Sequence, residues 1–142
     1  MSEQPTVNRY LKDKAFDHID HALGRPVDPM RASYRNYFAT DAKSDLATKF
    51  NASPFWRCNG VTNCGMAYFG VTDAGRAALR DHLKAIGSKT RVFQVTFNGY
   101  ASNIAADSAA KAKYQHWLQC SDSNPDLTFA AYQRRVTVQV PA

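Results

Sequence analysis

The fold is decided by residues 55–87, which read FWRCNGVTNCGMAYFGVTDAGRAALRDHLKAIG. Two short runs of aromatic and aliphatic residues flank a turn-rich segment that contains Asn59-Gly60, a pattern that predicts a β-hairpin over residues 55–71. Thr72 follows at once with a side chain suited to cap a helix. An apolar stripe at helical spacing then ends at Gly87: Leu79, Leu83 and Ile86. The segment predicts a hairpin that runs directly into a helix.

Two further helices are expected before the hairpin. Apolar residues recur every three or four positions over residues 8–23, with Asn8 as the expected N-cap and Gly24 as the stop. Residues 25–40 contain two prolines and are expected to form a loop that leads to a short element of uncertain type. Residues 41–51 predict a second helix, with apolar side chains one turn apart: Ala42, Leu46 and Phe50.

A short polar break at residues 88–90 marks the expected boundary between two subdomains, 1–87 and 88–142. Beyond it, residues 91–97 alternate between apolar and polar side chains, and Asn98-Gly99 is a strong hairpin signal. The return strand is expected over residues 100–106.

The remaining elements complete a small antiparallel β-β-α-β module. A helix is expected from Asp107 or Ser108 to Cys120, with one face formed by Ala110, Tyr114, Trp117 and Leu118. Asp126 is the expected cap of a short helix over residues 127–133. Residues 134–140 alternate again and predict a last strand, which pairs with either strand of the preceding hairpin. The helix that holds Trp117 is expected to cover one face of this sheet.

Part of the chain resembles winged-helix proteins, in which the second wing strand often runs into a helix through a Thr-x-x-Gly-x-x-x-Leu pattern. Thr72, Gly75 and Leu79 match it. The resemblance implies an α+β fold, with a winged-helix-like helical part that contains a β-hairpin. The chain departs from the pattern in one respect: residues 41–51 are the one clear helix between the first helix and the hairpin, whereas a helix-turn-helix needs two.

Short motifs also resemble a group of small phage and prophage proteins. They are HALGRP at 21–26, YRNYF at 34–38 and ADSAAKAKY at 106–114. This resemblance implies a phage-encoded accessory protein in the cytoplasm of a bacterial host. It implies no particular activity.

Charge gives the main indication of a partner. The chain carries 18 Lys and Arg against 12 Asp and Glu, a net charge of +6. The surplus is +3 in each subdomain, from 12 basic and 9 acidic residues in 1–87 and from 6 and 3 in 88–142. Basic side chains neutralise phosphates, and exposed Tyr34, Tyr37 or Trp56 would stack on bases. The candidate nucleic-acid contacts are Arg31, Arg35, Lys43, Lys49, Arg57, Lys111, Lys113, Arg134 and Arg135.

A protein-interaction module is the alternative function: a phage inhibitor of a host protein, or a virion component. Seventeen aromatic residues are many for one small chain, and exposed tyrosines are common interface anchors. The predicted hairpins also offer edge strands to a partner or to a second copy. No apolar run is long enough to span a membrane, so we expect no membrane partner.

Metal, disulfide and enzyme chemistry are not expected. The segment Asp17-His18-Ile19-Asp20-His21 places two His and two Asp at i, i+3, which offers two metal ligands, but a solvated polar face is the simpler interpretation. Cys58 and Cys64 could face each other for a disulfide or half a zinc site, whereas reduced thiols are favoured for them and for Cys120. No nucleophile, phosphate-loop or dinucleotide motif is present, so we expect neither an enzyme nor a cofactor.

Overall fold

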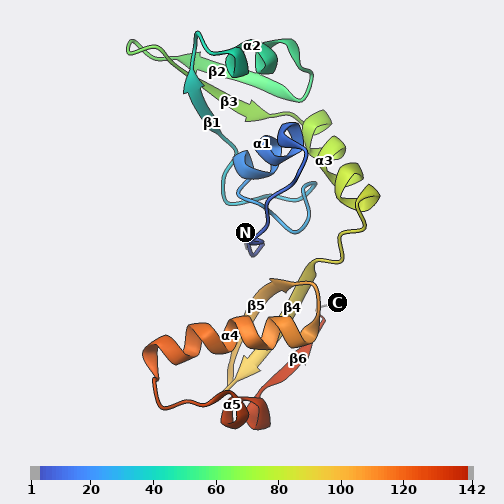
Figure 1. The fold of residues 1–142 in the computed structure, drawn as a ribbon, viewed down its shortest axis with the longest axis vertical. Helices are drawn as coiled ribbons and strands as arrows, with labels where there is room; N and C mark the ends of the chain where they lie inside the picture. The colour runs from blue at the N-terminus through green and yellow to red at the C-terminus, as the bar shows by residue number, and fades with distance from the viewer. Residues whose placement is uncertain (1–3, 141–142) are drawn as a thin grey trace. The chain divides into compact units, whose positions relative to one another are not determined.

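The structure of the chain is a computed structural model that describes residues 4–140. These residues form five helices and two three-stranded antiparallel sheets, so the fold is of the α+β class (Figure 1). The chain divides after Gly87 into two compact units, here called the N-terminal and C-terminal units. No helix among residues 4–140 is both long enough and apolar enough to cross a membrane.

The sheet of the N-terminal unit has the strand order β1-β3-β2, and its strands are β1 (Phe38–Asp41), β2 (Trp56–Val61) and β3 (Met66–Val71). Strands β2 and β3 are the hairpin that the sequence predicts. Strand β1 lies where only a short element of uncertain type was expected. With four residues it is too short to show a clear alternation, and its pairing with β3, which joins Phe38 to Phe69, identifies it as a strand.

Three helices surround the inner face of this sheet: α1 (Lys14–Ala22), α2 (Asp45–Ala52) and α3 (Asp73–Ala85) (Figure 1). All three contribute to one apolar core. Its buried side chains from α1, α2, the sheet and α3 include Ile19, Leu23, Phe50, Trp56, Phe69, Val71, Leu79 and Leu83.

Helices α1 and α2 both begin later than the sequence predicts. The side chain of Asp13, and not that of Asn8, caps α1 by accepting a hydrogen bond from the backbone N–H of Ala15 at 3.0 Å. Ser44 caps α2 in the same way, and Asp41 belongs to β1. In both cases a residue further along the chain, Asp13 or Ser44, serves as the N-cap. The helix begins there because the N-cap sets where helical dihedral angles start.

The junction between β3 and α3 explains the Thr-x-x-Gly pattern. The Thr72 hydroxyl accepts from the Gly75 N–H at 3.2 Å and donates to the Pro54 carbonyl at 2.7 Å. A Cβ on Gly75 would lie 2.5 Å from the Phe55 carbonyl oxygen. Only glycine therefore lets the first turn of α3 approach the start of β2 so closely.

The side chain of Asn36 extends the pairing of β1 with β3. Its Nδ2 donates to the Val71 carbonyl at 3.1 Å, and its Oδ1 accepts from the Val71 N–H at 2.7 Å. The amide thereby satisfies both backbone groups at the end of β3, as a paired strand residue would.

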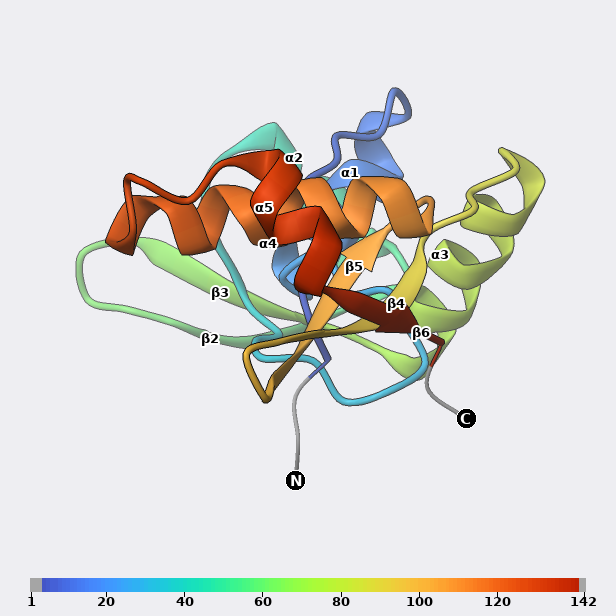
Figure 2. The ribbon, with the colours of Figure 1, turned by 90° about the horizontal axis from the view of Figure 1, so that it is seen from below.

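The C-terminal unit is a β-β-α-α-β module. Its elements are β4 (Arg91–Phe97), β5 (Tyr100–Ala106), α4 (Ala109–Ser123), α5 (Phe129–Arg135) and β6 (Thr137–Gln139). The strand order is β5-β4-β6, so the last strand pairs with the first strand of the predicted hairpin. Helix α4 runs across the sheet beside α5 (Figure 2). The core contains Phe93, Val95, Ile104, Ala112 and Tyr132.

Three local predictions in this unit are wrong. Thr128 caps α5 instead of Asp126, and α5 continues to Arg135, so β6 is only three residues long. The buried face of α4 is formed by Ala112 and His116. Of the predicted face, Trp117 packs against the core, while Ala110, Tyr114 and Leu118 are exposed. The reason is that small Ala112 allows a close approach to the sheet and His116 has a hydrogen-bond partner, Tyr132 on α5.

Candidate nucleic-acid interface

A sharp turn after α1 creates the best candidate binding surface. Gly24 and Arg25 both have positive φ, +80° and +54° respectively. A Cβ on Gly24 would lie 2.2 Å from Cε1 of Tyr34, so the tyrosine ring packs directly on the glycine. The turn thus brings residues 34–37 against the C-terminal end of α1.

Three exposed tyrosines and two partly buried arginines gather around this turn. The guanidinium of Arg25 lies 4.6 Å from the ring centre of Tyr10, and that of Arg35 lies 4.6 Å from the ring centre of Tyr37. Tyr10, Tyr34 and Tyr37 are 81%, 51% and 49% exposed. We call these five residues the tyrosine–arginine cluster. A hollow of about 270 Å³ is lined by four of them together with Thr6, Val7, His21 and Gly24.

A buried ion network lies beneath the cluster. The Asp20 carboxylate is fully buried and accepts hydrogen bonds from Arg9 Nε at 2.9 Å, Arg9 Nη2 at 2.6 Å and Arg25 Nη1 at 3.2 Å. Arg25 Nη1 also donates to Asp17 at 2.8 Å. This hydrogen bond lowers the pKa of Asp17 against the opposing effect of its partial burial, which is the larger single influence. The network neutralises Arg9 and Arg25 and fixes the position of the Arg25 side chain.

Arg35 differs because none of the described residues forms an ion pair with it. Its Nε donates to the Ala22 carbonyl at 3.3 Å and its Nη2 donates to the Tyr37 carbonyl at 3.2 Å. Partial desolvation, followed by the positive charges of Arg35 and Arg25, lowers the pKa of neighbouring His21. The cluster therefore presents a net positive charge that is available to an anion.

The segment that carries Tyr34 and Arg35 is held by hydrogen bonds from distant parts of the N-terminal unit. Arg76 on α3 donates to the carbonyls of Pro29 and Arg31 at 2.9 and 3.1 Å. The side chain of Gln4 exchanges two hydrogen bonds with the backbone of Asp28, at 2.7 and 2.8 Å. These contacts preorganise the surface, which reduces the entropy lost when a ligand binds.

The other sequence-predicted contacts of the N-terminal unit lie on separate elements. Arg31 is in the same loop as Arg35, Lys43 precedes α2, Lys49 is on α2 and Arg57 is on β2. All four are exposed. Arg57 donates to the side chain of Asn59 at 3.0 Å and lies over Gly70. Of the predicted residues, the structure places Arg35 in the tyrosine–arginine cluster together with the two predicted stacking residues, Tyr34 and Tyr37. Trp56, the third, is buried and cannot stack on a base.

The predicted contacts of the C-terminal unit lie on its two helices. Lys111 and Lys113 are on α4, and Lys111 lies 3.6 Å from the Asp107 carboxylate. Arg134 and Arg135 are on α5 and not on a strand, as the sequence predicted. Arg135 hydrogen-bonds the side chain of Asn98 and lies 5.0 Å from the ring centre of Phe97. Two of these four charges are thus engaged within the unit.

The Asp and His residues of α1 differ in their surroundings: three of them are engaged within the unit, whereas His21 is exposed. Asp17 and Asp20 belong to the ion network, and His18 packs edge-on against Phe38 and Phe50. Cys58, Cys64 and Cys120 are free thiols. Within residues 4–140 no group of three or more potential ligands lies close enough to hold a metal ion.

Comparison of the chain with protein-family models, curated proteins and solved structures gave no match. Tyr10 and Arg25 are the cluster residues that sequence reasoning missed. Their contact depends on the turn at Gly24 and on the buried Asp20, and no local pattern in the sequence reports either one.

Proposed function

We propose that the protein binds single-stranded nucleic acid through the tyrosine–arginine cluster. The observation that carries the proposal is the placement of three exposed tyrosines beside Arg25 and Arg35, of which Arg35 has no carboxylate partner in the part of the chain described. Aromatic rings stack on unpaired bases and cations attract the phosphates between them, which is the usual chemistry of single-strand recognition. The net charge of +6 adds a long-range attraction.

A single strand fits the N-terminal unit better than a duplex does. One helix of eight residues, α2, lies between α1 and the hairpin, and it buries Ala47 and Phe50. A winged-helix-like origin of this unit is supported by its three-stranded sheet and by the hairpin that leads into α3. Readout of the major groove by a helix-turn-helix would require a second, exposed helix in this segment. The short motifs similar to phage and prophage proteins support an accessory role in a bacterial host.

Titration with labelled oligonucleotides tests the proposal. Fluorescence anisotropy at low salt compares single-stranded DNA, single-stranded RNA and duplex DNA of equal length. We expect saturable binding of a single strand that weakens steeply as salt is raised, because phosphate contacts release counterions. Flat titrations for both single strands, or equal affinity for the duplex, would contradict the proposal.

Two tyrosines of nearly equal exposure provide a matched pair of variants. Tyr10 in the cluster is 81% exposed and Tyr100 in the C-terminal unit is 79% exposed. A stacked base is worth about 1–3 kcal/mol, so Tyr10→Ala should weaken binding about 5- to 150-fold. Tyr100→Ala should leave the affinity unchanged. Equal effects of the two substitutions would show that the cluster is not the site.

Arg35 is tested through the salt dependence. Arg35→Ala should reduce the slope of log K against log salt by about one. Arg80→Ala is the control, because Arg80 lies on α3 and its ion-pair partner among residues 4–140 is its neighbour Asp81. Thermal unfolding of each variant separates lost binding from lost structure, since Arg35 also donates to two backbone carbonyls.

Binding of another protein is the second candidate function, and one observation on α4 favours it. Tyr114 and Leu118 are 50% and 44% exposed and lie one turn apart on the same face. An exposed aromatic–aliphatic pair of this kind is a common interface anchor. A pull-down from a bacterial lysate with and without nuclease distinguishes the two functions. Capture that survives nuclease and is lost in Tyr114→Ala favours a protein partner, whereas capture that requires nucleic acid favours the cluster.

A further inference from the structure

A second hollow lies between α1 and α2, on residues that the tyrosine–arginine cluster does not use. Its volume is about 300 Å³, at the lower end of the range for small-molecule sites. The walls are largely apolar: Phe16 and Ile19 from α1, Leu46 and Phe50 from α2, and Phe55 and Trp56 at the start of β2. Such a hollow accepts an apolar group of limited size.

Aromatic stacking holds the walls of this hollow in place. Trp56 stacks on Phe50 with ring centres 3.9 Å apart and an angle of 12° between the planes. Phe16 stacks on His82 of α3, with ring centres 4.1 Å apart. Phe50 and Trp56 are buried in the core of the unit. Because stacking and core packing hold these rings in place, the hollow is preformed before any ligand binds.

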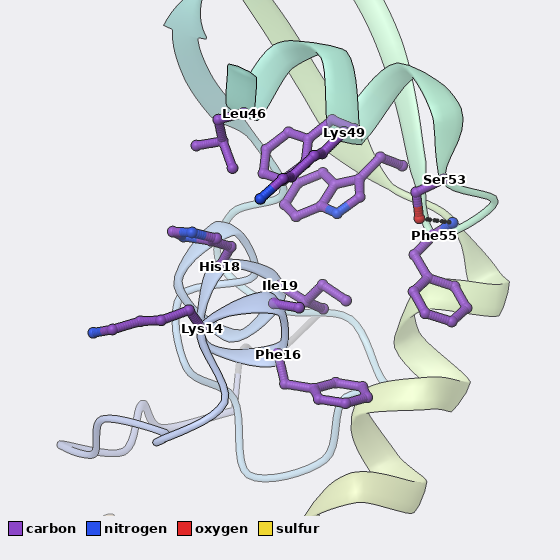
Figure 3. Close-up of a pocket in the computed structure, with 11 residues that line it drawn as sticks. Lys14, Phe16, His18, Ile19, Leu46, Lys49, Ser53 and Phe55 are labelled. Atoms are coloured by element: carbon purple, nitrogen blue, oxygen red, sulfur yellow. Dashed lines mark hydrogen bonds between the residues drawn. The ribbon is translucent and has the colours of Figure 1, made fainter. Parts of the chain in front are cut away.

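Two lysines and a histidine lie along one side of the hollow. Figure 3 shows Lys14, His18 and Lys49 toward one side and Phe55 toward the other. The eleven lining residues include no Asp or Glu. Lys14 and Lys49 are exposed, and neither forms an ion pair with any residue between 4 and 140. The hollow therefore combines an apolar floor with positive charge at its rim.

We propose that this hollow is a binding site for a small amphipathic carboxylate, whose apolar body contacts Phe50, Phe55 and Trp56 and whose carboxylate lies between Lys14 and Lys49. Burial of the body supplies most of the affinity, because apolar area leaves water. The lysines select the head group, since a carboxylate gains two cationic neighbours there and an ammonium is repelled by both. His18 adds a ring nitrogen on the same side.

Trp56 reports directly on occupancy. The chain has two tryptophans, and Trp117 lies in the C-terminal unit, so a Trp117→Phe background leaves Trp56 as the single fluorophore of this kind. The probes are decanoate, decanol and decylamine, which share one alkyl chain and differ in charge. We expect decanoate to change the Trp56 emission saturably and with the highest affinity, decanol to bind more weakly, and decylamine to bind least.

The lysine variants test the head-group contact. The double variant Lys14→Gln, Lys49→Gln should weaken decanoate binding about 5- to 30-fold and leave decanol binding unchanged. The matched control is Lys12→Gln, Lys43→Gln, which removes the same charge from two exposed lysines outside the hollow. All four lysines are exposed, so the variants should retain the thermal stability of the parent.

Three results would overturn the proposal: equal affinity for all three probes, decanoate binding that the Lys14 and Lys49 changes do not weaken, or no change in Trp56 emission up to the solubility limit of decanoate. The first two would leave an unselective apolar hollow, and the third would leave no ligand site at all. None of these outcomes bears on oligonucleotide binding, because the hollow and the tyrosine–arginine cluster share no residue.

Discussion

The buried carboxylate of Asp20 receives both Nε and Nη2 of Arg9, at 2.9 and 2.6 Å. This bidentate ion pair joins the segment before α1 to the buried side of the helix. Arg9 Nη2 also donates to the carbonyl of Pro26 at 2.9 Å, so one guanidinium connects three stretches of chain. The segment around Arg9 is thereby part of the folded unit.

Removal of Asp20 should destabilise the N-terminal unit strongly. Asp20→Ala leaves Arg9 as an uncompensated, mostly buried charge, and we expect a loss of about 3–5 kcal/mol in the free energy of unfolding. Urea denaturation followed by Trp56 fluorescence in a Trp117→Phe background measures it. Asp81→Ala is the control, because its ion pair with Arg80 is exposed and should contribute less than about 1 kcal/mol. Similar losses in the two variants would contradict the role given to the buried pair.

Two glycines with similar backbone angles should respond differently to alanine. Gly24 and Gly65 have φ of +80° and +86°, so either substitution costs about 1–2 kcal/mol of left-handed strain. Gly24→Ala also forces a Cβ into the Tyr34 ring, whereas a Cβ on Gly65 meets nothing within 4 Å. We therefore expect the larger loss of stability for Gly24→Ala, together with shifted NMR signals of Tyr34. Equal losses in thermal unfolding would show that the ring moves aside at no cost.

The three thiols should differ in reactivity toward iodoacetamide. A hydrogen bond between the Cys64 sulfur and the Thr62 hydroxyl, 3.0 Å long, lowers the pKa of Cys64, whereas burial raises the pKa of Cys120. Because the thiolate is the nucleophile, Cys64 should be alkylated first and Cys120 last in a time course read by peptide mass spectrometry. Thr62→Val should slow the alkylation of Cys64 and leave the alkylation rate of the exposed Cys58 unchanged. A Cys64 rate unaffected by Thr62→Val would argue against this hydrogen bond.

The stability of the C-terminal unit should fall in mild acid. His116 is 7% exposed, and burial lowers its pKa below the usual 6.5. In the unfolded chain the His116 imidazole therefore binds a proton near pH 6.5, whereas in the folded chain it does so only at lower pH. The free energy of unfolding therefore decreases as the pH drops below 6.5. Urea denaturation followed by Trp117 fluorescence in a Trp56→Phe background measures it. The free energy of unfolding should depend less on pH in His116→Gln. A pKa of His116 above 6.5 in the folded protein, measured by NMR titration, would contradict the prediction.

The hydroxyl of Tyr132 gives the opposite pH dependence at the alkaline end. It lies 2.7 Å from Nδ1 of His116, and burial, with a further contribution from Cys120, raises its pKa to about 12. The unfolded tyrosine loses its proton near pH 10, before the folded one does, so stability decreases as the pH rises above 10. Tyr132→Phe should remove this decrease in the same Trp117 assay. Tyrosinate absorbance of the folded protein at pH 10 should be the same in the parent and in Tyr132→Phe, and a smaller absorbance in the variant would contradict the prediction.

The sequence was most informative where a local pattern alone fixes structure. The β2–β3 hairpin, the Thr72 cap and the β4–β5 hairpin at Asn98-Gly99 need only alternation, a cap residue and a turn residue, and all three are confirmed. Strand β1 is paired with residues about thirty positions away, and its four residues carry too little pattern to be recognised alone. The prediction for the buried face of α4 was wrong at Tyr114, because the large apolar side chain of Tyr114 was favoured over the small side chain of Ala112.

The candidate site was predictable only in part, for a related reason. Tyr34, Arg35 and Tyr37 stand together in the sequence and were expected to contact nucleic acid. Tyr10 and Arg25 join them through a left-handed turn and a buried carboxylate. Asp20 itself looked like part of a polar helix face, since a helical pattern does not show which polar side chain has buried partners.

The amide of Asn36 has a further consequence for how the first sheet assembles. A shift of β1 by one position along β3 would turn Phe38 toward water and carry Ala39 into the core, and it would also break both hydrogen bonds to Val71. Hydrophobic contrast alone discriminates weakly between alignments of so short a strand. The two hydrogen bonds of the Asn36 amide also depend on the register. One alignment of β1 therefore satisfies both the apolar and the hydrogen-bonding requirements.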